Sequence, residues 1–220
     1  MKKIIALVAV AAVSISMVCA EIGLTLGAKG NFGMNLGSQV DEKTDGMKAA
    51  FAVNGGGSIY GRYNMPFLPA LGVQLEVGMT FGNAIGEAKD NKNSRYNSYN
   101  SFDIPVLVTY DIPVSSVVIT PMLGMNFSIP FGAPTSHSKI DGEKDSKKVD
   151  GYKVTGFIPG LVAGVEVAIP AGPGSITAGL SYVNDFTPVK AKGEIFGVTF
   201  EKEVGIRRNF NISAGYAIKL

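Results

Sequence analysis

The sequence has a single cysteine, a single histidine and no tryptophan. The cysteine, Cys19, lies in an apolar N-terminal segment, so residues 21–220 contain no thiol for a disulfide bond or a thiolate metal site. The histidine, His137, has no histidine or cysteine near it in the sequence that could complete a metal site. We therefore expect neither a metal ion nor a cofactor. General acid–base chemistry most often uses histidine. The only one, His137, lies in a charged connection that lacks the fixed geometry a catalytic group needs, so we also expect no enzyme activity.

Strong charge of either sign is missing as well. The chain has 20 basic and 18 acidic residues, which give a formal net charge of +2. No basic run is interleaved with aromatic residues, and this argues against binding to nucleic acid. A second long apolar run after the N-terminal one is also missing, so residues 21–220 do not have the pattern of a transmembrane helix.

Residues 1–20 have the pattern of a secretory signal peptide. Two lysines precede an apolar run, Ile4 to Val13, that is too short to cross a bilayer as a helix. Val18 and Ala20 fit the small-residue pattern that signal peptidase reads, so we expect cleavage after Ala20. A lipoprotein acylated at Cys19 is the alternative, and it is less favoured because the preceding Val18 is branched.

The rest of the sequence is marked by apolar residues at every second position. Between residues 71 and 81, for example, apolar side chains alternate with glycine, glutamine, glutamate and threonine. This spacing predicts strands and excludes amphipathic helices. Eight such runs occur, near residues 24–36, 51–63, 71–81, 102–110, 117–127, 161–169, 176–182 and 210–220.

The connections between the runs alternate in length. Those after the second, fourth and sixth runs are short (residues 64–70, 111–116 and 170–174), and the others are long and polar (37–47, 83–98, 130–150 and 187–205). Short periplasmic turns and long extracellular loops are typical of outer-membrane barrels. We predict an all-β fold, an eight-stranded antiparallel up-and-down transmembrane β-barrel over residues 21–220. A secreted soluble barrel of the lipocalin type is disfavoured, because the second face of the strands carries mainly small and polar residues.

The C-terminal residues carry a more specific motif. Ser213 to Leu220 follows the pattern polar, any, Gly, any, any, apolar, any, apolar, which resembles the signal that the barrel-assembly machinery reads on the last strand. Residues 21–220 resemble the OmpW, OmpX and Opa-like group of small outer-membrane barrels, and the glycine-rich, tryptophan-free composition is similar to spirochaetal members. The resemblance implies a location in the bacterial outer membrane, contact with its lipid, and the assembly machinery as a partner.

Charged residues on the polar face of the predicted strands are candidates for the barrel lumen. They are Lys29, Arg62, Glu76, Asp103, Glu166, Asp185, Arg207 and Lys219. Strand direction places four of them (Arg62, Glu76, Glu166 and Lys219) toward the periplasm, three (Asp103, Asp185 and Arg207) toward the outside, and Lys29 between. Buried charges need partners, so we hypothesise a salt-bridged plug. Pairs that only fill and rigidify the lumen are favoured over an ion or solute gate.

The long connections supply candidate surface contacts. They are Arg95, Tyr96 and Tyr99 in the second and Lys139, Lys147 and Lys148 in the third. Arginine and aromatic residues favour recognition, although the two tyrosines could instead belong to an interfacial aromatic belt. The third connection, which also holds His137, is expected to be a solvated loop. In the fourth, Ile195, Val198 and Phe200 alternate with other residues and could form a hairpin.

Two functions follow from this interpretation. The first is a narrow pore or passive channel for small solutes, with apolar solutes leaving through the wall as the resemblance to OmpW would imply. The second is a non-conducting barrel that displays its loops for adhesion or contact with host surface molecules.

Overall fold

A computed structural model describes residues 23–36, 48–49, 52–88, 94–140, 143–148, 152–195 and 198–220. The predicted signal peptide and its cleavage site lie outside these residues. Within the described part of the chain, no helix is long and apolar enough to cross a membrane.

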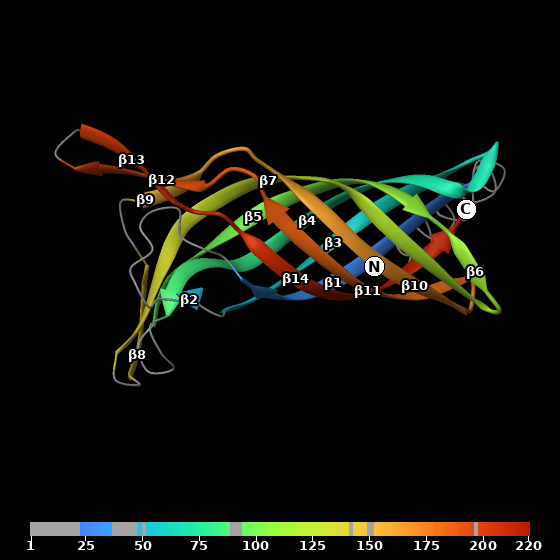
Figure 1. The fold of residues 1–220 in the computed structure, drawn as a ribbon, viewed down its shortest axis with the longest axis horizontal. Coiled ribbons are helices and arrows are strands. Elements are labelled where there is room, and N and C mark those ends of the chain that lie inside the picture. The colour runs from blue at the N-terminus through green and yellow to red at the C-terminus, as the bar shows by residue number, and fades with distance from the viewer. Residues whose placement is uncertain are drawn as a thin grey trace, which may run out of the picture.

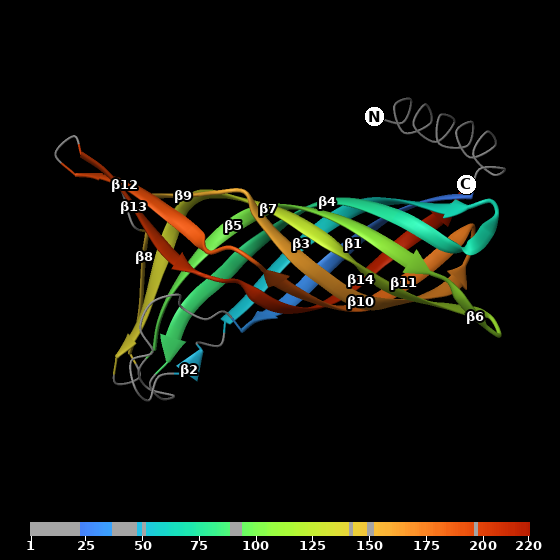
Figure 2. The same ribbon diagram turned by 45° about the horizontal axis from the view of Figure 1, so that its top comes forward.

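Eight antiparallel strands form a closed ring (Figures 1 and 2). They are β1 (Leu24–Asn35), β3 (Ala52–Met65), β4 (Leu68–Ala88), β5 (Ser94–Tyr110), β7 (Val117–Ile140), β10 (Ile158–Ala171), β11 (Gly174–Asp185) and β14 (Arg208–Lys219). The ring closes because the first strand pairs with the last, β1 with β14, in an unbroken register, and β7 pairs with β10. The predicted all-β barrel is confirmed.

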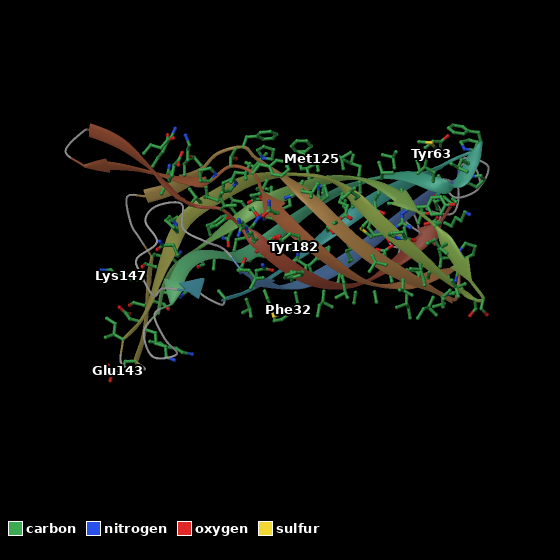
Figure 3. All side chains as sticks on the ribbon, in the orientation of Figure 1. Phe32, Tyr63, Met125, Glu143, Lys147 and Tyr182 are labelled. Carbon is green, nitrogen blue, oxygen red and sulfur yellow. The ribbon has the colours of Figure 1, made fainter. Side chains whose placement is uncertain are left out.

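The two faces of each strand differ as a membrane barrel requires. On β4, Val73, Leu75 and Val77 are exposed on the outside, whereas the alternating Gln74 and Glu76 are buried in the interior. Many other large apolar residues on the outer wall are exposed, Ile59, Val108 and Leu180 by more than half, and the sticks in Figure 3 point outward along the whole barrel. A soluble barrel would bury its apolar face inside. The outward apolar band therefore speaks against the lipocalin alternative.

Three tight turns join strands at the end of the barrel where the C-terminus lies (Figure 1). Residues 66–67 form the first turn, and Gly172, with φ of 62°, lies in the turn between β10 and β11. Between β5 and β7, the short strand β6 (Ile112–Val114) pairs with the start of β7 across a turn at Ser115, whose φ is 55°. The short connections are where the sequence predicted them.

The opposite end has more strand than the sequence predicted. β4, β5 and β7 continue as paired strands well past the ring, as far as the pairs Ala88 with Ser94 and Ser94 with Lys139. β7 then pairs with β8 (Glu143–Lys148), and β2 (Lys48–Ala49) pairs with the end of β4. The loops predicted over residues 83–98 and 130–150 are therefore wrong over most of their length. Both faces of this sheet contact solvent, so its strands carry polar residues at successive positions. The alternation of apolar and polar residues that identifies a strand is then missing, and the sequence looks like that of a loop.

A separate three-stranded sheet stands at this end of the molecule (left in Figure 1). It consists of β9 (Tyr152–Thr155), β12 (Val189–Ile195) and β13 (Val198–Gly205), and β12 and β13 form the hairpin considered for residues 187–205. Val154 and Val189 of this sheet pack with Tyr99 of β5 and Ile158 of β10. This small apolar core fixes the sheet to the mouth of the barrel.

Candidate functional site: the charged lumen and the extracellular strands

An outer ionic layer crosses the lumen near the mouth of the barrel and contains Arg207, Asp103 and Asp185. Arg207 donates two hydrogen bonds to Asp185, from Nε at 3.0 Å and from Nη2 at 3.1 Å, and a third from Nη1 to Asp103 at 3.0 Å. Arg207 and Asp185 are almost completely buried. One guanidinium group therefore bridges two carboxylates from β5 and β11, on different sides of the lumen.

Asp103 also accepts hydrogen bonds from neutral side chains around it. The donors are Thr80 at 2.8 Å, Ser101 at 3.0 Å, Asn126 at 3.2 Å and Ser128 at 2.7 Å. They come from three adjacent strands, β4, β5 and β7, whose inward positions meet at this height. This carboxylate has a complete set of partners and is fixed in place.

An inner ionic layer lies nearer the periplasmic turns and consists of Lys29, Glu76, Arg62, Glu166 and Asp111. Lys29 Nζ lies 2.7 Å from Glu76, and Arg62 Nη2 lies 2.7 Å from Glu166. Arg62 also approaches Asp111 at 3.5 Å, and Asp111 is the most exposed member of the group.

Gln74 connects the two halves of the inner layer. It accepts a hydrogen bond from Arg62 Nε at 2.7 Å and donates one to Glu76 at 2.6 Å. The ring of Tyr60 lies beside both cations, with its centre 5.3 Å from Lys29 Nζ and 5.8 Å from Arg62 Cζ. Gly27 faces this ring across the strand pair, and a Cβ atom at that position would overlap it. The missing side chain makes room for the tyrosine.

A cavity of about 80 Å³ lies between the two layers. Lys29 and Glu76 border it on one side and Asp103 and Arg207 on the other. An apolar cluster also narrows the lumen here, formed by the buried side chains of Leu107, Met122 and Val162. The cavity has room for a few water molecules, and both of its ends are bounded by ion pairs.

The structure brings seven of the eight predicted lumen charges into ion pairs. Lys219 is the exception, because it lies exposed at the end of β14. Asp111 was not predicted, because it lies in the short connection after the fourth run; its odd-numbered position, shared with Asp103, is the signal that could have placed it in the lumen. Gln74 and Tyr60 carry no charge, so the pattern of charged residues on the strands could not point to them.

The predicted surface contacts have different environments. Lys147 and Lys148 are exposed on β8 and Lys139 is partly buried on β7, while the side chains of Arg95 and Tyr96 lie outside the described part of the structure. Tyr99 is only 4% exposed, so its prediction as a surface or belt residue is wrong. The sequence could not show that the sheet of β9, β12 and β13 packs over it.

His137 links three strands near the tip of this region. Its Nε2 lies 2.8 Å from Ser98 Oγ on β5, and its Nδ1 lies 2.8 Å from Ser146 Oγ on β8. Partial burial lowers the pKa of His137 below its usual value, because a charged ring loses hydration there. The described residues contain no cluster of three or more His, Cys, Asp or Glu side chains suited to a metal ion.

Comparison with known proteins agrees with this architecture. The family model described as outer membrane protein beta-barrel domain matches residues 5–217. A major outer membrane protein from Thermus thermophilus has a TM-score of 0.55 at 17% identity, covering 90% of this chain and 99% of that one. The outer membrane protein OprG from Pseudomonas aeruginosa has a TM-score of 0.54 at 13% identity, with 90% and 97% covered. No curated protein sequence matches. The predicted resemblance to small outer-membrane barrels is confirmed.

Proposed function

Because this chain belongs to the outer membrane protein beta-barrel domain family, we propose that it is an outer-membrane barrel with a sealed lumen that acts through its extracellular strands. In this proposal the barrel is an anchor in the outer membrane. The strands beyond it form a binding surface for molecules outside the cell.

The two ionic layers are the observation that carries this proposal. A solute would have to separate Arg207 from Asp103 and Asp185, and then Arg62 and Lys29 from their own carboxylates. Separating a buried ion pair leaves charges without partners and costs about 3–5 kcal/mol per pair. The narrow pore that the sequence also suggested requires both layers to open together. The 80 Å³ cavity between the layers is too small to serve as a pathway by itself.

The extracellular strands have features that suit a binding surface. β4, β5, β7 and β8 form a paired sheet beyond the barrel, and the buried contact of Tyr99 with Val154 and Val189 holds the second sheet in place. Sites on fixed strands lose little conformational entropy when they bind a partner. Lys147 and Lys148 are exposed on β8. These cations favour a partner with anionic groups on its surface.

Conductance tests the sealed lumen. Mature protein, purified in detergent and shown to be folded by its heat-modifiable gel mobility, is added to a planar lipid bilayer. We expect folded barrels that insert without discrete openings. Stepwise openings from the unmodified protein, altered in size by Glu76→Gln, would instead establish the pore.

Adhesion is tested separately with cells that display the barrel and a dextran sulfate resin as the anionic probe. We expect salt-sensitive retention that falls when Lys147 and Lys148 are both replaced by glutamine. Lys219→Gln removes an exposed cation at the other end of the barrel and should change nothing. Equal retention of all three forms would refute a role for β8.

A further inference from the structure

The outer wall of the barrel has an apolar groove that is separate from the lumen and from the extracellular sheets. Its volume is about 590 Å³, and it runs across β10, β11, β14 and β1. Its lining includes the outward side chains of Phe32, Met34, Leu180, Tyr182, Phe210 and Ile212. Figure 3 labels Phe32 and Tyr182 on this stretch of the wall.

The groove arises from the order of large and small side chains around the barrel. On β10, Ala163 lies in register with Tyr182 of β11, which in turn lies in register with Phe210 of β14. The rings of Tyr182 and Phe210 are in contact, with their centres 4.8 Å apart. The small side chain of Ala163 beside these rings leaves a hollow next to large apolar residues of β11, β14 and β1.

A cation stands at the extracellular end of this groove. Arg208 is exposed and precedes Phe210 by two residues on the outward face of β14, so their Cα atoms are separated by about 7 Å along the strand. Arg208 Nε donates a hydrogen bond of 3.2 Å to Asn184 Oδ1, and Asn184 likewise stands two residues beyond Tyr182 on β11. Among the described residues, the two terminal nitrogens of Arg208 have no hydrogen-bond acceptor.

We propose that this groove binds one anionic glycerophospholipid, with an acyl chain along the apolar lining and the headgroup phosphate on Arg208. The groove lies within the apolar band of the wall, where acyl chains are its natural contacts. The guanidinium group presents paired N–H donors that match phosphate oxygens, and the hydrogen bond to Asn184 restrains its orientation. Aromatic side chains next to the polar pair are typical of the membrane interface, where a headgroup lies.

A single hollow with a single cation favours a lipid over a protein partner. The outer wall is apolar on all sides, so the exposed cation Arg208 near the groove, held by Asn184, is the feature that favours a ligand with both an apolar chain and an anionic group. The cation Arg208 lies at one end of the apolar lining, just as the headgroup of a phospholipid lies at one end of its acyl chains. The site lies outside the lumen, so it does not depend on whether the lumen is sealed.

Native mass spectrometry of the detergent-purified mature barrel tests the proposal. Phosphatidylglycerol is added in increasing amounts, with phosphatidylcholine as the zwitterionic comparison. We expect one phosphatidylglycerol molecule to be retained in preference. Arg208→Gln should weaken this retention about tenfold, which corresponds to the loss of one charge-assisted contact. Ala163→Phe should weaken it by a similar factor by filling the groove.

Two matched variants control for general effects on the outer wall and on charge. Ala178→Phe adds the same ring at an exposed alanine of β11 that does not line the groove, and Lys219→Gln removes an exposed cation at the periplasmic end of β14. Both should retain phosphatidylglycerol as the unmodified protein does, and all variants must show heat-modifiable mobility. Unchanged retention in Arg208→Gln and Ala163→Phe would overturn the site. Preferential retention of lipid A would overturn its assignment to a glycerophospholipid.

Discussion

The outer and inner ionic layers both pair carboxylates in the lumen with cations, but they do so in different ways. In the outer layer one cation, Arg207, serves two carboxylates, Asp103 and Asp185. In the inner layer two cations from neighbouring strands, Lys29 and Arg62, serve three carboxylates and are connected through Gln74. The outer layer therefore depends on one side chain, whereas the inner layer shares its contacts among several. The layers should differ in how much stability a single substitution removes.

The largest effect should come from Arg207→Met. This change keeps most of the side-chain volume but removes the cation from two buried carboxylates: Asp103 keeps only its neutral hydrogen-bond donors, and Asp185 loses both hydrogen bonds from Arg207. Removing one partner of a buried ion pair costs about 3–5 kcal/mol, and here two carboxylates lose it. The loss should appear as a lower urea midpoint for unfolding in lipid vesicles, followed by heat-modifiable gel mobility. The control is Lys219→Gln, whose exposed side chain should leave the midpoint unchanged.

A rescue experiment decides whether charge is the cause. Adding Asp103→Asn and Asp185→Asn to Arg207→Met removes the two stranded charges and should restore a large part of the lost stability. If the triple variant were as unstable as Arg207→Met alone, the loss would come from packing around Arg207 instead.

Arg62→Met should have a smaller effect, about 3 kcal/mol in the free energy of unfolding. It leaves only Glu166 fully buried without its ion pair, because Asp111 is partly exposed and keeps hydrogen bonds from Asn64 at 2.9 Å and Thr120 at 2.8 Å. The same urea series measures it. A loss larger than that of Arg207→Met would contradict the difference between the layers.

Lys29→Met should cost less still, about 1–2 kcal/mol. Its partner Glu76 keeps hydrogen bonds from Gln74 at 2.6 Å and from Ser58 at 3.3 Å. Combining Lys29→Met with Gln74→Met removes this second support. The loss in the double variant should exceed the sum of the two single losses, and simple additivity would refute a connected inner layer.

The smallest effect lies outside both layers, at His137. Its pKa is lowered by burial in the folded protein, so the unfolded chain binds the proton more readily as the pH falls through about 6.5. Local stability of the β7–β8 hairpin should therefore be fully present above that pH and decline below it. The protection factor for amide hydrogen exchange around Ser146, which corrects the observed rate for its intrinsic pH dependence, should be lower at pH 5 than at pH 7. In His137→Gln the titrating ring is absent, and this difference should disappear.

The extracellular region is where the structure differs most from the prediction made from the sequence. Polar residues of 83–98 and 130–150 were assigned to loops, whereas β4, β5, β7 and β8 cover most of them. Tyr99 was assigned to the surface and is buried against Val154 and Val189 of the second sheet. Strand pairing beyond the membrane depends on which backbone groups meet across the sheet, and this is not encoded in any one segment.

The sequence alone determined the eight membrane strands, their direction and the face on which each side chain lies. These follow from a local rule, because successive side chains of a strand point to opposite faces and apolar ones must face lipid. Tertiary structure alone decided which charges meet. Arg62 of β3 reaches Glu166 of β10, and Arg207 joins Asp103 of β5 to Asp185 of β11, across distances in sequence that no local pattern spans. Such partners are set by the stagger of the strands around the closed ring, which is a property of the whole barrel.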